Sequence, residues 1–215
     1  MTTDLSFFDR VRRIVQARLA GADGCHDWDH TERVCRNAEL LLREFPDADA
    51  EVVRLAALLH DVGRPDEKAD GRVCHARRGA ELTEEILTEL RMEPGKIKKT
   101  VAAVRTHRYR DDTVPASLEA EIVYDADKLD SLGAVGIGRA FLFAGKFGAR
   151  LHNTEKEALE SAAYSPEDTA YREYLVKLRK LPGAMRTLPG KRLACERVRF
   201  MQEFFDRLNA ETAAG

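Results

Sequence analysis

Residues 51 to 61, EVVRLAALLHD, decide the fold that we predict for this chain. The second half of the segment is apolar on nearly every side of a helix, which favours a central and buried position. His60 and Asp61 end the helical pattern, and Gly63 and Pro65 break it. The segment therefore predicts a buried helix that ends in two ionisable side chains inside the protein.

Most of the remaining chain also repeats apolar residues at helical intervals, so we predict an all-α fold. Besides the central segment, the expected helices cover residues 7–19, 30–45, 75–90, 97–107, 118–132, 171–181 and 192–208. Asp29 is the expected N-cap of the second helix, with Glu32 completing a pattern like a capping box. Residues 63–73 are polar and are expected to form a loop, and residues 145–168 are polar and are expected to be a variable excursion.

The length of 215 residues fits a single domain over 1–215, with a core at about 26–140 and C-terminal helices at about 168–210 packing on it. The formal net charge is −2, and like charges form no long run, so we do not expect nucleic acid as a partner. An apolar stretch of about 18 residues and a signal-peptide pattern are both missing, so we expect no membrane span and a cytoplasmic location.

Ionisable side chains interrupt the apolar helical tracts at four places. They are His30, His60, Asp61 and Asp127. An unpaired buried charge is costly, so such groups are expected to be paired or to ligate a metal. Two imidazoles and two carboxylates suit Mn²⁺, Mg²⁺, Co²⁺, Fe²⁺, Ni²⁺ or Zn²⁺ and leave coordination positions open for water and substrate. A metal in such a site would activate water and polarise a phosphoryl oxygen.

The motifs around these residues resemble a known family. The segments HTERV at His30, LLHDVGR at His60 and YDADKLDSLG at Asp127 look like the H…HD…D signature of the HD-domain metal-dependent phosphohydrolase superfamily. Further motifs, HDWDH, HARRGAE, VRTHRYR and KRLACERVRFMQEFFDRL, make residues 5–208 similar to the small single-domain predicted HD hydrolases of bacteria and archaea. The segment AAYSPEDTAYREYL at 162–175 departs from the family pattern, which puts one expected pocket wall in doubt.

The resemblance implies a helical bundle of the HD type that binds a divalent metal through four ligands. These ligands are His30, His60, Asp61 and Asp127. It also implies hydrolysis of a phosphate ester or anhydride in a small substrate, most commonly a nucleotide. Some similar proteins cleave nucleoside triphosphates to monophosphate and pyrophosphate.

His75 and His107 raise the question of a second metal. In two-metal HD proteins, histidines at comparable places hold the second ion and the aspartate of the doublet bridges, so Asp61 is the expected bridge here. We expect one metal, because no further carboxylate is evident behind the two histidines, and a second site through His75 and His107 is the alternative. With one metal, the two imidazoles are the expected donors or general acid towards the phosphates.

Other residues are expected to act on the substrate. The expected substrate-binding residues are His26, Arg64, Lys128 and Arg139. Arg64 and Lys128 adjoin ligands in the sequence, and a polyphosphate needs cations besides the metal. Asp130, three residues after Asp127 on the same helix face, is an expected catalytic residue with His75 and His107 because it can orient a histidine or a metal-bound water.

Two functions of other classes stay open at this stage. A di-iron oxygenase is one, because some HD folds carry such chemistry, and it requires two metals. A nucleotide-binding sensor without turnover is the other, because ligands alone do not establish catalysis. Both a monomer and a homodimer fit the sequence.

Overall fold

The computed structural model describes residues 5–22, 24–108 and 114–212. Every regular element in these ranges is a helix and no strand occurs in them, so the predicted all-α fold is confirmed. Contacts divide the chain into an N-terminal unit, Met1–Asp127, and a C-terminal unit, Lys128–Gly215. The domain boundaries predicted from the sequence stay a prediction.

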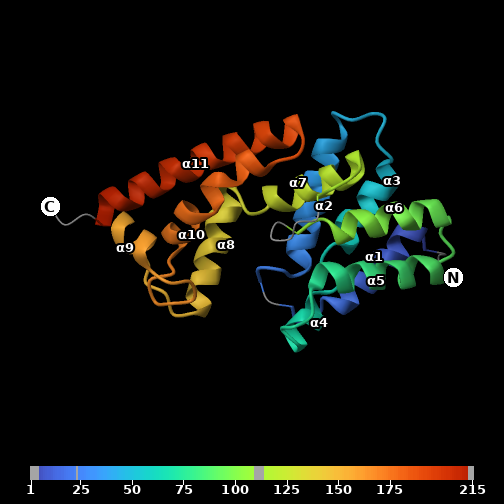
Figure 1. The fold of residues 1–215 in the computed structure, drawn as a ribbon, viewed down its shortest axis with the longest axis horizontal. Coiled ribbons are helices and arrows are strands. Elements are labelled where there is room, and N and C mark those ends of the chain that lie inside the picture. Colours follow the sequence, from blue (N-terminus) through green and yellow to red (C-terminus); the bar gives the residue numbers. More distant parts are fainter. Residues whose placement is uncertain (1–4, 23, 109–113, 213–215) are drawn as a thin grey trace. The chain divides into compact units, whose positions relative to one another are not determined.

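The N-terminal unit is built around its third helix (Figure 1). Its helices are α1 (Phe7–Arg18), α2 (Trp28–Leu42), α3 (Ala50–Leu59), α4 (Arg64–Ala69), α5 (His75–Glu89), α6 (Pro94–Arg105) and α7 (Leu118–Leu129), the last of which runs across the unit boundary. α3 packs against α1, α2 and α6, and α5 packs against α4 and α6. Most side chains of α3 are buried, so the predicted central helix is confirmed.

A carboxylate caps the start of the central helix α3. Asp49 accepts a hydrogen bond from the backbone N–H of Val52 and caps α3. Such a bond satisfies a backbone donor that has no partner within the helix. Glu119 of α7 accepts a hydrogen bond from the backbone N–H of Asp49, so the starts of α3 and α7 are tied together.

The predicted N-cap of α2 is wrong. Asp27, and not Asp29, is the cap, because Asp27 Oδ1 accepts from the backbone N–H of His30 at 2.9 Å. An N-cap side chain bonds the second or third residue of the helix, and both aspartates fit that criterion in the sequence. His30 is therefore the third residue of α2 rather than its first, still within the first turn of the helix.

The expectation of an irregular connection at residues 63–73 is also wrong, because α4 lies within it. Pro65 occupies the first turn of α4, where a backbone N–H has no helical partner and proline is tolerated. From the sequence, this proline was expected to break the helical pattern. In the structure it instead helps to start a short polar helix that leads towards α5.

The C-terminal unit contains a long last helix and shorter ones before it. Its elements are α8 (Gly133–Lys146), α9 (Glu155–Glu160), α10 (Ala170–Val176), the 3-10 helix η1 (Leu178–Ala184) and α11 (Leu188–Thr212). α8 and η1 pack against α11, and Phe205 stacks with Tyr174 in the core of this unit. The predicted helix 171–181 is split, because α10 ends at Val176 and η1 follows. The polar stretch 145–168 contains α9.

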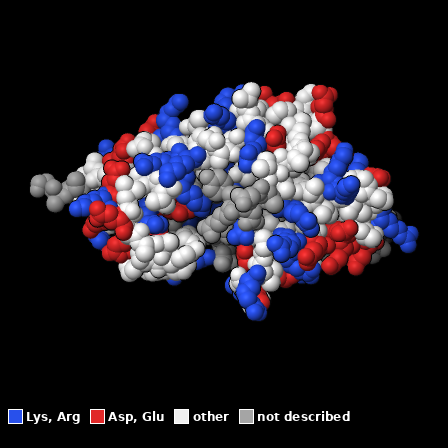
Figure 2. All heavy atoms as spheres, in the orientation of Figure 1, with Lys and Arg blue, Asp and Glu red and all other residues white. Residues whose placement is uncertain are grey.

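The charges on the surface are mixed. On the face drawn in Figure 2, Lys and Arg side chains alternate with Asp and Glu side chains over each unit, in keeping with the net charge of −2. Among the residues that the structure describes, no helix has the length and apolarity that crossing a membrane requires.

Candidate metal centre

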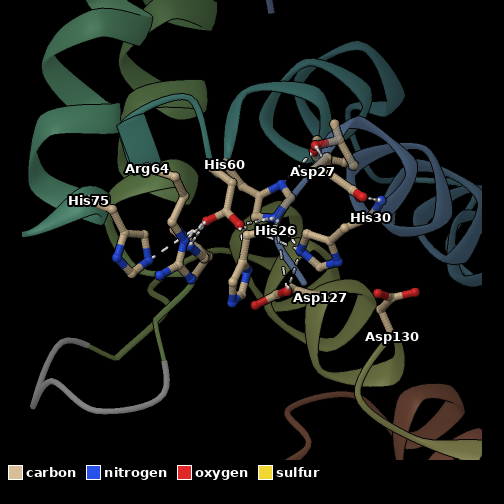
Figure 3. Close-up of polar contacts among 12 residues, drawn as sticks. His26, Asp27, His30, His60, Arg64, His75, Asp127 and Asp130 are labelled. Carbon is tan, nitrogen blue, oxygen red and sulfur yellow. Dashed lines mark hydrogen bonds and ion pairs between the residues drawn. The ribbon is translucent and has the colours of Figure 1, made fainter. Parts of the chain in front are cut away.

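Five histidine side chains of the N-terminal unit surround the carboxylate of Asp61. Figure 3 shows four of them, His26, His30, His60 and His75, gathered around one centre. Asp61 directly follows the last turn of α3 and is 2% exposed. The surrounding imidazoles belong to His26, His30, His60, His75 and His107. His30 and His75 lie in the first turns of α2 and α5, and His60 and His107 lie just after α3 and α6, so the ends of four helices supply these rings.

The four predicted metal ligands lie together on one side of Asp61. Asp61 Oδ2 is 3.6 Å from Nε2 of His30 and 3.6 Å from Nε2 of His60. Asp127 Oδ1 is 3.5 Å from Nε2 of His30 and 3.9 Å from Nε2 of His60. The two Nε2 atoms are 3.2 Å apart. We call His30, His60, Asp127 and Asp61 Oδ2 the Oδ2 group.

The other oxygen of Asp61 faces the two additional histidines. Asp61 Oδ1 is 3.7 Å from Nε2 of His75 and 3.5 Å from Nε2 of His107. We call these three residues the Oδ1 group. Their ligand atoms lie within 4.8 Å of one another, as do those of His30, His60 and Asp127. The arrangement is the one expected for an aspartate that bridges two cation sites.

Hydrogen bonds on the outer sides of the imidazole rings determine which ring nitrogen directs a lone pair at the centre. His60 Nδ1 lies 2.8 Å from the carbonyl oxygen of Ala57, and His107 Nδ1 lies 2.6 Å from that of Val104. A carbonyl oxygen only accepts, so each Nδ1 carries a proton, and in the neutral ring the Nε2 atom presents a lone pair. Lone pairs and carboxylate oxygens that face one another repel unless a cation lies among them. The donor set therefore fits a divalent metal ion.

Glu67 is a residue of the centre that the sequence analysis missed. Its Oε1 accepts a hydrogen bond from Nδ1 of His75 at 2.9 Å. The Nε2 of His75 is buried and has no hydrogen-bond partner among the described residues. A carboxylate behind a ligating histidine fixes the tautomer and the ring orientation. Glu67 precedes His75 by eight residues, and this spacing alone does not predict a contact. The helix α4 brings the carboxylate of Glu67 to the ring of His75.

Arg64, predicted to bind the substrate, is joined to the centre itself. Its Nε donates to Asp61 Oδ1 at 2.9 Å, and its Nη1 donates to Glu67 Oε2 at 2.8 Å. His26, also predicted to contact the substrate, lies on the Oδ2 side, with Nδ1 at 3.0 Å from Asp61 Oδ2. Both side chains therefore hold Asp61 in place, and their predicted contacts with a substrate stay predictions.

Three predicted residues belong to the C-terminal unit. Lys128 and Asp130 are largely buried, and Arg139 Nη1 donates to Asp130 Oδ2 at 2.7 Å. The Asp130 carboxylate is thus neutralised by Arg139 within this unit. The roles predicted for these residues in binding and catalysis stay predictions.

The protonation states suit metal binding. Burial alone would raise the pKa of the Asp61 carboxyl, but Arg64 and the imidazole of His60 hold this pKa well below its ordinary value. Burial lowers the pKa of His60 to about 3 even though Asp61 acts in the opposite direction. Burial and the charge of Arg64 lower the pKa of His75 to about 4. Near pH 7 the carboxylate is charged and both imidazoles are neutral, as metal ligands must be.

We expect the metal-free protein to lose stability in mild acid. In the unfolded chain His60 and His75 take up protons near pH 6.5, whereas in the folded protein they stay neutral down to about pH 3 and 4. Stability therefore falls as the pH drops below 6.5, by about 1.4 kcal/mol per histidine at pH 5.5. The melting temperature should fall by roughly 6–12 °C between pH 7.5 and 5.5. Thermal unfolding after metal removal measures this, and a constant melting temperature would contradict the buried neutral histidines.

The residues of the Oδ2 group and of the Oδ1 group all lie within the part of the chain that matches one protein family. The model of the HD domain family matches residues 27–132. YpgQ of Bacillus subtilis strain 168 is 33% identical over 221 residues, which cover 97% of this chain and 95% of YpgQ. The crystal structure of YpgQ in complex with ADP has a TM-score of 0.73 at 28% identity and covers 96% of this chain and 98% of that one.

A second solved structure agrees. It is described as a predicted HD superfamily hydrolase from an uncultured Thermotogales bacterium, with a TM-score of 0.68 and 29% identity. The match covers 95% of this chain and 92% of that chain. The similarity extends over both units of the chain and is not confined to the ligand-bearing helices.

Proposed function

We propose, from the membership of this chain in the HD-domain family, that it is a divalent-metal-dependent phosphohydrolase that acts on a nucleotide. Solved structures similar to it include a predicted HD superfamily hydrolase. One observation carries the proposal. The buried carboxylate of Asp61 turns each of its oxygens towards a separate set of imidazole nitrogens. Imidazole nitrogens and carboxylate oxygens gathered in this way form a donor set that fits a divalent cation.

Each residue of the centre has a distinct task in this proposal. His30, His60, Asp61 and Asp127 hold the metal, which when bound supplies a nucleophile at neutral pH and polarises a phosphoryl oxygen. The backbone carbonyl of Ala57 keeps His60 in the tautomer that can ligate. The oxygen ligands and the count of four protein ligands leave coordination positions for a substrate phosphate.

Arg64, Glu67 and His75 form a hydrogen-bonded network on the Oδ1 side of Asp61. Arg64 anchors the bridging carboxylate through Oδ1, and Glu67 holds both Arg64 and His75. This network keeps the Nε2 of His75 directed at Asp61 and away from bulk water, with His75 2% exposed. The preorganised ring can take a second cation without a rearrangement of its neighbours.

The nucleotide part of the proposal is supported by the relative that was crystallised with ADP. YpgQ is similar to this chain over nearly the whole of both chains, so a ligand site near the shared centre is expected in both. Phosphate anhydrides are also the natural targets of a metal centre flanked by guanidinium groups, because charge develops on the phosphoryl oxygens in the transition state.

Two measurements test the proposal. The first is elemental analysis of protein purified without added metal or chelator. The second is the release of phosphate and pyrophosphate from a panel of nucleotides in the presence of Mn²⁺. We expect between one and two metal ions per chain and release from one class of nucleotide. Chelator should abolish release, and added metal should restore it. Two iron ions with substrate-dependent oxygen uptake would instead support an oxygenase. Tight nucleotide binding with no product would support a sensor.

A further inference from the structure

The short helix α4 carries two residues of the metal centre but has no apolar anchor. Arg64 and Glu67 both belong to it, and Glu67 accepts the hydrogen bond of His75. None of the residues of α4 is buried, so apolar packing does not fix its position. A helix of this length is also unstable by itself, because it forms few backbone hydrogen bonds for the residues that it orders. Polar contacts with neighbouring segments therefore hold α4 in place.

Asp66 of α4 makes two such contacts, one with each of its carboxylate oxygens. Its Oδ1 accepts from Nη2 of Arg18 on α1 at 2.6 Å, and its Oδ2 accepts from Nε of Arg78 on α5 at 2.8 Å. Arg18 Nε also donates to the backbone oxygen of Val62 at 2.8 Å, directly after Asp61 in the chain. One carboxylate thus ties α4 to two longer helices of the same unit.

A cavity beside α4 shows why the contact with α1 matters. The cavity has a volume of about 250 Å³, and its lining includes residues 20–22, which follow α1, and several residues of α4, Glu67 among them. Side chains do not fill the space between these two segments along the cavity. The hydrogen bond between Arg18 and Asp66 joins the two segments beside that space.

We propose that Asp66 is a positioning residue of the metal centre. By tying α4 to α1 and α5, it directs the Glu67 carboxylate at Nδ1 of His75 and keeps Nε2 of that ring turned towards Asp61. The side-chain hydrogen bonds of Asp66 go to arginines and not to a histidine, so Asp66 acts through Glu67. The proposal rests on the proposed function for its metal centre, but it does not require hydrolysis.

The Asp66→Asn variant tests the role, because an amide offers one acceptor oxygen where the carboxylate offers two. One of the two arginines then loses its bond, whichever way the amide turns. In metal-free protein with isotope-labelled histidine, we expect the NMR signal of the His75 Nδ1 proton to be lost through exchange with water. The melting temperature should fall by no more than about 4 °C, since partly exposed ion pairs contribute little to stability.

A double-mutant cycle in Mn²⁺ affinity, measured by calorimetric titration, separates positioning from a merely structural role. Glu67→Ala should weaken Mn²⁺ binding about 10–100-fold, as loss of a partner behind a ligating histidine does. Asp66→Asn should also weaken it, but by less than about twofold in the Glu67→Ala background, because both substitutions act on one hydrogen bond. If Asp66 were merely structural, the two losses would add.

The Glu81→Gln variant is the matched control. Glu81 accepts from Nη1 of Arg78 at 3.0 Å, but both residues belong to α5, so this variant leaves α4 as it is. It should keep the wild-type His75 signal and Mn²⁺ affinity. Arg78→Met removes the bond between α4 and α5 alone and should act as Asp66→Asn does, which keeps the role testable if Asp66→Asn folds poorly.

Two outcomes would overturn the role of Asp66. One is a wild-type His75 signal in Asp66→Asn, and the other is a loss of Mn²⁺ affinity that adds fully to that of Glu67→Ala. Wild-type protein that binds no Mn²⁺ would instead overturn the proposed function. The His75 signal of the metal-free protein would still decide the role of Asp66 in that case.

Discussion

The Asp61→Ala variant is expected to lose its bound metal and its turnover while its helices remain folded. Asp61 directs one carboxylate oxygen at the Oδ2 group and the other at the Oδ1 group, with contacts of 3.5–3.7 Å to four imidazole nitrogens. Its removal takes a ligand from the predicted site and the bridge from any second site. The loss of activity should exceed the roughly 10–100-fold typical of partners that lie behind a ligand.

Three measurements on this variant separate chemistry from folding. They are metal content by elemental analysis, helix content by circular dichroism and kcat on the substrate found with the wild type. Asp61→Asn should behave in the same way, because it keeps the size of the side chain but not the charge. Asp70→Ala removes a partly exposed aspartate that is paired with Arg72 and should keep wild-type metal content and activity. A fully metallated and active Asp61→Ala protein would refute the proposed centre.

The Gly63→Ala variant is expected to be destabilised and to have a disturbed metal centre. A Cβ atom at this position would lie 2.3 Å from the backbone oxygen of His75 and 2.6 Å from the backbone nitrogen of Gly79. Both atoms belong to the backbone of α5, so the helix itself has to move. Overpacking of this kind costs about 1–3 kcal/mol and occasionally more. The movement should also carry the ring of His75 away from Asp61, which lies only two residues before Gly63.

Thermal unfolding and metal titration measure the two effects of Gly63→Ala. The melting temperature should fall by roughly 2–4 °C for each kcal/mol lost. Gly71→Ala is the matched control, because a Cβ at Gly71 would meet no atom within 4 Å. A Gly63→Ala variant with the melting temperature and the metal affinity of the wild type would contradict the close approach of α5 to Gly63.

The sequence allowed the fold class to be predicted because helical periodicity repeats along most of the chain. The apolar segment before His60 was expected to be central, and α3 is central, since burial on every side requires an apolar residue at nearly every position. The boundaries of short polar helices were harder. α4 buries none of its residues, so it has no apolar face for a sequence pattern to reveal.

The part of the candidate site that lies in sequence motifs was predictable. The four expected ligands are brought together, although their binding of a metal stays a prediction. The role of Glu67 was not predictable, because it depends on the turn of α4 that brings its carboxylate to His75. The one-metal expectation relied on the absence of such a carboxylate. Glu67 removes that reason, and the number of metal ions is left to elemental analysis.

Sharing the carboxylate of Asp61 has a thermodynamic consequence for cation binding. Two cations that each take one of its oxygens compete for the same negative charge, so occupancy of one position alters the affinity of the other. Linkage makes that effect reciprocal: the factor by which the first cation weakens the second equals the factor by which the second weakens the first. A titration with metal should then follow two stepwise constants and not one curve for independent sites. The coupling free energy between them would report how evenly the charge of a single aspartate is divided.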